Sequence, residues 1–129
     1  MNSQTTLLSA CIAGFLGVAL GAFGAHGLKG VIDPTLMAAY QTGVQYHLVH
    51  AVTLMGVGIW QQVAQQQATC TRWLNRAAAL LLAGIILFSG SLYLMAITGI
   101  RPLGIITPFG GTSWLIGWVM LAWATRVRT

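Results

Sequence analysis

The stretch TLLSACIAGFLGVALGAFGA, residues Thr6 to Ala25, contains twenty consecutive residues without a charged side chain. A helix needs about 20 mainly apolar residues to cross the roughly 30 Å hydrocarbon core of a bilayer. A second uncharged stretch, AAALLLAGIILFSGSLYLMAI, runs from Ala77 to Ile97. Each of the two stretches predicts a transmembrane helix.

A third crossing is predicted at residues 42–60, inside a longer helix. Asp33 is suited to cap the N-terminus of this helix, and Pro34 suits its first position, where no amide hydrogen bond is lost. Helix is then expected as far as Gln61, which is too long for one perpendicular crossing at 1.5 Å per residue. Residues 35–41 are therefore assigned to the membrane interface.

The fourth crossing is predicted at residues 103–124. Pro108, followed by two glycines, indicates either a kink or the start of the regular helix at that point. Few residues remain for loops. The sequence therefore predicts an all-α, integral membrane four-helix bundle with short loops, in a single domain over residues 1–129.

Composition supports this class of protein. The chain is 57% hydrophobic and 5% charged, whereas about a quarter of the residues of a soluble domain are charged. The net charge of +5 comes from basic residues scattered between and after the apolar stretches, without a basic face for nucleic acid. The expected partner is the lipid bilayer.

Basic residues also predict the topology. An even number of crossings places both termini on one side, together with the connection between the second and third helices. The basic residues on that side are Arg72, Arg76, Arg126 and Arg128, against Lys29 and Arg101 on the other side. The positive-inside rule therefore favours cytoplasmic termini in an inner membrane. No basic residue precedes the first apolar stretch, so we expect that helix to be retained rather than cleaved as a signal peptide.

The connection between the second and third helices is rich in glutamine from Gln61 to Gln67 and is expected to be a polar loop. Cys70 is assigned to the same connection, whereas Cys11 lies in the first apolar stretch. The two thiols are expected at different depths, so no disulfide is predicted.

Small residues predict helix packing faces, because glycine and serine let backbones approach closely in a membrane. They recur every three or four positions on the first helix and again on the fourth. The predicted packing residues are Gly14, Gly17, Gly21, Gly24, Gly110, Ser113 and Gly117.

The second helix carries a polar face. At 100° per residue, one arc of about 140° holds Tyr40, Gly43, Tyr46, His47, His50 and Thr53. Ionisable residues at membrane depth usually point into the bundle. Together with residues that neighbouring helices offer, the candidate cluster is His26, Tyr40, Tyr46, His47, His50, Ser89 and Tyr93.

Two interpretations of this cluster remain open. In the first, neutral histidines hydrogen-bond to Ser89, Tyr93 or a backbone carbonyl and hold helices together. In the second, the histidines line a proton, metal or polar-ligand site, because imidazole titrates near neutrality and an i, i+3 pair can share a metal.

Enzyme chemistry has little support in the sequence. The sole side-chain carboxylate is Asp33, so paired acid/base chemistry is absent, and the histidine spacing is not that of a zinc protease. Gly111, Thr112 and Ser113 match the short motif of some serine nucleophiles, which chance also produces in a glycine-rich chain. We predict no catalytic residues, no metal and no cofactor.

Five ordered strings resemble the YgdD family of small inner-membrane proteins. These strings are GAFGAH at 21–26, YQTG at 40–43, Tyr46 with His50, FSGSLY at 88–93 and PFGG at 108–111. The resemblance covers nearly the whole chain and implies a four-helix membrane protein without an assigned activity. The positions that match its motifs are His26, Tyr40, Gln41, Gly43, Tyr46, His50, Ser89, Tyr93, Pro108 and Gly110.

Two functions follow as hypotheses. The first is a non-enzymatic structural or accessory component, acting as a homo-oligomer or within a larger membrane complex. The alternative is a proton, ion or small-solute pathway lined by the polar face of the second helix. A dry, fully hydrogen-bonded face would support the first, and a water-accessible cavity reaching His47 or His50 the second.

Overall fold

The first half of the chain forms two helices. A computed structural model describes residues 1–127. Helix α1 spans Ser3–Phe23 and continues as a π-helical turn, η1, over Gly24–Leu28. Helix α2 spans Pro34–Val63. The Asp33 carboxylate accepts a hydrogen bond from the Thr35 amide at 2.8 Å and Pro34 occupies the first turn, which confirms the predicted helix start.

The second half forms two further helical rods. Helix α3 (Ala68–Gly84), the π-helical turn η2 (Ile85–Ser89) and helix α4 (Gly90–Thr98) follow one another without a break. This rod ends at Gly99, whose φ of +72° is a left-handed conformation that glycine adopts without steric cost. A 3₁₀ turn, η3 (Arg101–Ile105), then leads into α5 (Thr107–Ala124), so the regular helix starts next to Pro108.

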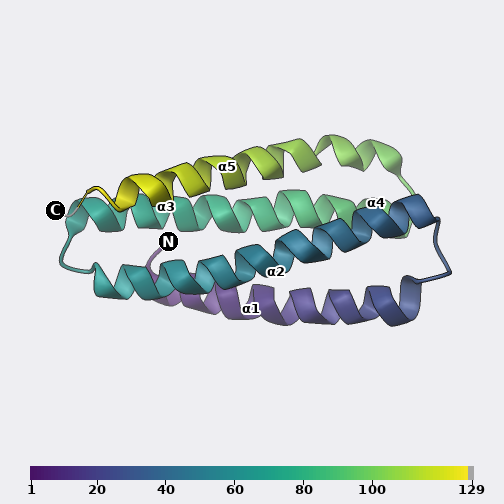
Figure 1. Cartoon of the computed structure of the whole chain (residues 1–129), viewed down its shortest axis with the longest axis horizontal. Coiled ribbons are helices and arrows are strands. Elements are labelled where there is room, and N and C mark those ends of the chain that lie inside the picture. Colours follow the sequence, from purple (N-terminus) through teal and green to yellow (C-terminus); the bar gives the residue numbers. More distant parts are fainter. Residues whose placement is uncertain (128–129) are drawn as a thin grey trace.

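The described residues form four rods that run side by side along the long axis of the molecule (Figure 1). Helix α1 packs on α2, α5 packs on α3 and η2, and α2 joins the two pairs through α3, η2 and α4. The start of α1, the α2–α3 turn and the end of α5 lie at one end of the bundle (Figure 1). The α1–α2 and α4–α5 loops lie at the other end. The chain is therefore an all-α, four-helix membrane bundle.

Three of the rods are long and apolar enough to cross a membrane by length and composition. They are Ser3–Leu28, Ala68–Thr98 and Arg101–Ala124. Helix α2 is not in this set, although its 30 residues make it about 45 Å long. Its polar side chains lower its hydropathy, and several of them are buried against the other rods. The polar helix is thus covered on its polar side by more apolar ones.

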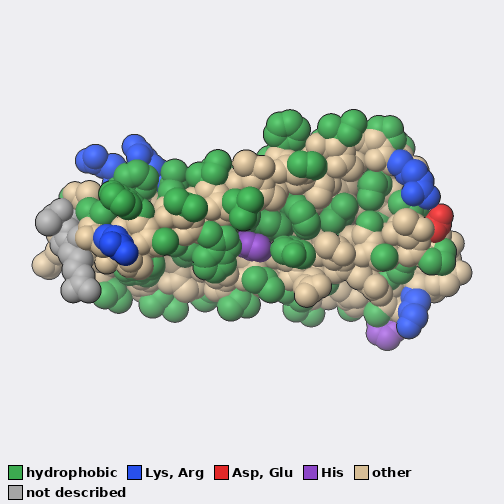
Figure 2. Space-filling model, turned by 45° about the horizontal axis from the view of Figure 1, so that its top comes forward, with side chains coloured by type: hydrophobic (Ala, Val, Ile, Leu, Met, Phe, Trp, Pro, Cys, Tyr) green, Lys and Arg blue, Asp and Glu red, His purple; other side chains and the backbone are tan. Residues whose placement is uncertain are grey.

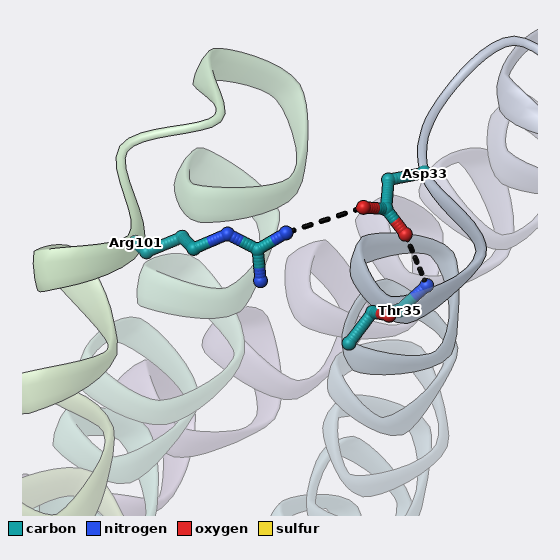
Figure 3. A network of polar contacts seen from close by, with 3 residues as sticks. All are labelled: Asp33, Thr35 and Arg101. Atoms are coloured by element: carbon teal, nitrogen blue, oxygen red, sulfur yellow. Dashed lines mark hydrogen bonds and ion pairs between the residues drawn. The ribbon is translucent and has the colours of Figure 1, made fainter.

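Charged side chains gather at the two ends of the bundle, and hydrophobic side chains cover the length between them on the face in Figure 2. At the end with the α1–α2 and α4–α5 loops, Arg101 donates to the Asp33 carboxylate at 3.2 Å and links these two loops (Figure 3). The hydrogen bond from the Thr35 amide, and then the Arg101 charge, hold the pKa of Asp33 below its usual range. Arg128 of the predicted basic tail lies outside the described residues.

The α2–α3 connection is shorter than predicted, and the placement of Cys70 in it was wrong. Helix α2 continues to Val63, two residues beyond the predicted end at Gln61, and the buried Gln61 amide donates to the Met1 carbonyl at 2.7 Å. Cys70 is buried within α3, where its thiol donates to the Ala124 carbonyl. Helices α2 and α3 thus extend beyond the predicted crossings at residues 42–60 and 77–97.

Candidate functional site

His47 connects three helices near the middle of the bundle. Its side chain is 3% exposed. Nε2 lies 2.8 Å from the Ala13 carbonyl of α1, and Nδ1 lies 2.8 Å from the Tyr93 hydroxyl of α4. A carbonyl only accepts, so Nε2 carries the proton, and Nδ1 is free to accept from Tyr93. One neutral tautomer therefore satisfies both ring nitrogens of His47.

His50, one turn further along α2, connects its own helix to α5. Nδ1 donates to the Tyr46 carbonyl at 2.8 Å, and Nε2 accepts from the Trp118 indole at 3.2 Å. The imidazole lies flat on the Trp114 ring, with 3.9 Å between centroids and 4° between planes. Because an indole N–H only donates, this arrangement requires an unprotonated Nε2. His50 is thus also a neutral ring with both nitrogens engaged.

Two other buried polar groups of the predicted cluster bond to backbone carbonyls. The Ser89 hydroxyl, in the π turn η2, donates to the Gly43 carbonyl of α2 at 2.7 Å. The Tyr40 hydroxyl donates to the Leu20 carbonyl of α1. Each bond crosses from one helix to another. The side chains of His47, His50, Ser89 and Tyr40 therefore all link α2 to a neighbouring helix.

Trp114 is seated in a recess that a glycine provides. A Cβ added at Gly84 of α3 would lie 2.2 Å from the indole ring, so no larger residue fits without a shift. The Trp114 indole also donates to the Leu81 carbonyl at 3.0 Å. Phe88 and Tyr46 flank the same ring, with centroids at 4.6 and 5.8 Å. The flat surface under His50 is consequently held in a fixed place.

The predicted packing residues of the fourth crossing lie against α3 and η2. A Cβ at Gly110 would lie 2.3 Å from the Phe88 backbone nitrogen, the shortest such approach to a backbone atom among the described glycines. Ser113 donates to the Leu80 carbonyl at 2.7 Å. Gly117 lies against Leu81. Because Ser113 bonds to a carbonyl, its hydroxyl is not paired with a histidine as a serine nucleophile would be.

The predicted glycine face of α1 lies partly against α2. An added Cβ would meet Leu48 at Gly17, Val44 at Gly21 and Tyr40 at Gly24, at 2.6, 3.2 and 2.4 Å. At Gly14, by contrast, nothing lies within 4 Å of that position. A side chain at Gly14 would therefore start in open space rather than against α2.

A shallow groove on the flank of the bundle reaches His50. Its volume is about 320 Å³, and its lining includes Tyr46, Phe88, Trp114 and Trp118. The rim residues Tyr46 and Trp118 are 45% and 46% exposed, which places the groove on the outer surface at mid-length. Such a groove faces lipid tails in a bilayer. Among residues 1–127, no cluster of three or more His, Cys, Asp and Glu side chains is arranged to hold a metal ion.

Two residues of the predicted cluster take no part in the side-chain hydrogen bonds. His26 is exposed at the end with the α1–α2 loop, and its side chain makes no hydrogen bond among the described residues. The Tyr46 ring packs on Phe88 and Trp114, but it is 45% exposed, and its hydroxyl has no hydrogen-bond partner within residues 1–127. Conversely, Trp114 and Trp118 contact His50 but are absent from the predicted cluster, because a single sequence does not give the register between helices.

Comparison with known proteins gives one family. The family described as protein of unknown function (DUF423) matches residues 20–111. UPF0382 membrane protein YwdK of Bacillus subtilis is 43% identical over 115 residues, covering 89% of this chain and 90% of that protein. UPF0382 inner membrane protein YgdD of Escherichia coli K12 is 38% identical over 129 residues, covering 99% and 95%. No solved structure matches.

Proposed function

The chain belongs to the DUF423 family of membrane proteins of unknown function, and from its buried contacts we propose that it is a non-enzymatic structural component of the inner membrane. In this proposal α2 is the fourth membrane-spanning helix and both termini are cytoplasmic. The protein acts through the surface that the bundle presents to other membrane proteins or to copies of itself. Its interior maintains the shape of that surface.

The observation that carries the proposal is the state of the two buried histidines. All four ring nitrogens of His47 and His50 have partners, on α1, α2, α4 and α5. A proton carrier needs a ring nitrogen that exchanges its proton with water or with another carrier. Here a proton gained by His50 would break its bond from the Trp118 indole, which only donates, and one gained by His47 would require the Tyr93 hydroxyl to turn from donor to acceptor. Such a network is suited to holding helices together.

The alternative is a pathway or binding site lined by α2, and the groove beside His50 is the observation that favours it. Its lining is mainly aromatic and it opens on the lipid-facing flank. A ligand there would arrive through the bilayer, whereas protons and ions arrive through water. The groove therefore supports a solute pathway less well than the hydrogen-bonded interior supports a structural role.

The experiment combines proton flux with thermal unfolding. Purified wild type, His50→Asn and His50→Leu are placed in vesicles holding a pH-sensitive dye, and their unfolding is followed in detergent. We expect wild-type vesicles to leak protons no faster than protein-free vesicles. His50→Leu should unfold at a lower temperature, because it removes the stacked ring and leaves the Trp118 N–H without its acceptor. His50→Asn retains an amide and should lose less stability.

A different pattern would overturn the structural proposal. Wild-type vesicles would conduct protons, and both variants would abolish the flux while unfolding at the wild-type temperature. Neither asparagine nor leucine titrates near neutral pH, so loss of flux without loss of stability would assign a proton-transfer role to His50.

A further inference from the structure

A groove runs between α1 and α2 on the outer surface of the bundle. It consists of two hollows of about 520 and 180 Å³, both lined by α2 and by α1 with its continuation η1. On α1 and η1 the lining residues Gly14, Val18, Gly21 and Ala25 follow one another every three or four positions, so they form one line along the rod. The two hollows are therefore successive parts of one α1–α2 groove.

Two glutamines, Gln41 and Gln45, line this groove on α2. Both side chains are exposed, and neither has a hydrogen-bond partner within residues 1–127. The exposed hydroxyl of Thr42, by contrast, donates to the Ala38 carbonyl of its own helix at 3.1 Å. The two amides are thus polar groups on the outer surface without an internal acceptor or donor.

Gln45 lies at membrane depth when residues 42–60 of α2 span the bilayer, a placement that rests on the proposed function, and Gln41 lies at the edge of the hydrocarbon core. The centre of that span is residue 51. Gln45 is about 9 Å from the centre along the axis and Gln41 about 15 Å, at 1.5 Å per residue. The half-thickness of the hydrocarbon core is roughly 15 Å. The bond from His47 to the Ala13 carbonyl places α1 at a matching depth.

An exposed amide in hydrocarbon has no water to bond, so its donors and acceptor remain unsatisfied unless protein covers them. We propose that a second copy of this chain covers the α1–α2 groove, with Gln41 and Gln45 hydrogen-bonding to the same residues of that copy. Both copies have the same orientation in the membrane, so the twofold axis runs along the bilayer normal and equal depths meet.

Three features favour a second copy as the occupant. A carboxamide is both a donor and an acceptor, so glutamine can pair with glutamine across a twofold axis. The lining holds no charged residue, so the two copies do not repel each other. Gly14, with open space around it, lies beside the projecting side chains of Phe15 and Val18, which are 74% and 66% exposed. The projecting side chains of one copy can therefore pack into the depression of the other.

The test measures self-association in vesicles of phosphatidylethanolamine and phosphatidylglycerol. Copies with a donor or an acceptor dye on a C-terminal tag are mixed, and energy transfer is followed as lipid is added. We expect transfer in the wild type above that of an unrelated monomeric membrane protein. Gly14→Leu fills the groove, and Gln45→Leu removes the amide pair, so each should weaken association by about three- to tenfold. Gly90→Leu, at another glycine with nothing within 4 Å, should associate as the wild type does.

Each variant also has a folding control and an independent readout. Gly14→Leu and Gln45→Leu should unfold at the wild-type temperature in detergent, because a Cβ at Gly14 meets nothing within 4 Å and the exposed Gln45 side chain has no hydrogen bond to lose among the described residues. Cys11 is exposed and lines the same groove. Mild oxidation in membranes should therefore give a Cys11-dependent dimer that is weaker in Gly14→Leu.

The proposal that a second copy covers the groove would be wrong if wild-type energy transfer were no higher than that of the monomeric control protein. It would also be wrong if both Gly14→Leu and Gln45→Leu associated as strongly as the wild type. This failure is separable from failure of the proposed function. A monomer that copurifies with another membrane protein, and loses it in Gln45→Leu, would still be a structural component. Proton flux through His50 would contradict the proposed function whether or not the chain self-associates.

Discussion

The Tyr93 hydroxyl joins α4 to α2 through His47, which lies 2.8 Å away. Tyr93→Phe removes only this oxygen and leaves Nδ1 of a buried imidazole without a donor. We expect a loss of about 1 kcal/mol in unfolding free energy, as for other interhelical bonds in membranes. Tyr46→Phe is the matched control, because the Tyr46 hydroxyl is without a hydrogen-bond partner in the described chain. Equal stability of the two variants in detergent unfolding would contradict the bond.

The burial of single residues on α2 was more predictable than their contacts with other helices. The arc on α2 predicted Tyr40, His47 and His50 to face inward, and all three are buried. The arc also included Tyr46, which faces outward, because an arc of 140° is wider than the surface that the neighbours cover. The indole partners of His50 depend on the axial register between α2 and α5. Periodicity within one helix contains no information on that register.

Close approach between helices depends on what faces each glycine. We expect Gly110→Ala to lower the unfolding free energy by about 1–3 kcal/mol, because its Cβ would meet the Phe88 backbone nitrogen, which only a helix shift can move. Gly17→Ala should cost less, since its Cβ would meet the mobile end of Leu48. Gly90→Ala should be neutral, because its Cβ meets nothing. Reversal of this order in thermal unfolding would mean that the helix contacts are assigned incorrectly.

At the level of elements, local rules predicted starts better than ends. Asp33 with Pro34, and Pro108, mark helix starts that the structure contains, because caps and prolines act on their own backbone. Helix α3 starts at Ala68, nine residues before the predicted crossing at Ala77. That crossing was defined by lipid-compatible composition, whereas the helix also includes the polar turns with Arg72 and Arg76. Nothing in the sequence pattern predicted the π turn η2.

For the whole molecule, composition predicted a membrane bundle because so few charged residues cannot cover a soluble surface. The order of packing was not predictable in the same way. Small residues occur on α1, α3 and α5, and each is compatible with several neighbours. The observed order, with α2 between α1 and the α3–α4 rod, becomes clear only from contacts such as Ser89 to Gly43 and His47 to Ala13. The buried polar groups on α2 thus specify which helices surround it.

The last prediction concerns the orientation of the whole bundle. Arg72, Arg76 and Arg126 lie at the end with the start of α1, and the other end holds Lys29 and Arg101. The positive-inside rule therefore predicts cytoplasmic termini. Single cysteines are introduced into a chain with Cys11→Ser and Cys70→Ser, at positions outside the proposed spans. The chosen positions are Val31 and Ile100 in the loops at one end, and Gln66 and Thr125 at the other, all of which are exposed.

A membrane-impermeant maleimide that can reach the outer face of the inner membrane should label residues 31 and 100 in intact bacteria. It should label residues 66 and 125 only after the inner membrane is permeabilised. If instead residues 66 and 125 were labelled in intact cells, and residues 31 and 100 only after permeabilisation, the predicted orientation would be wrong. The four-span bundle would still hold. Labelling of residues 66 and 125 from opposite sides would be a stronger contradiction, because an odd number of crossings would then separate them. In that case the α3–α4 rod and α5 could not both cross the membrane, and α2 would lose the apolar helices that cover its polar face.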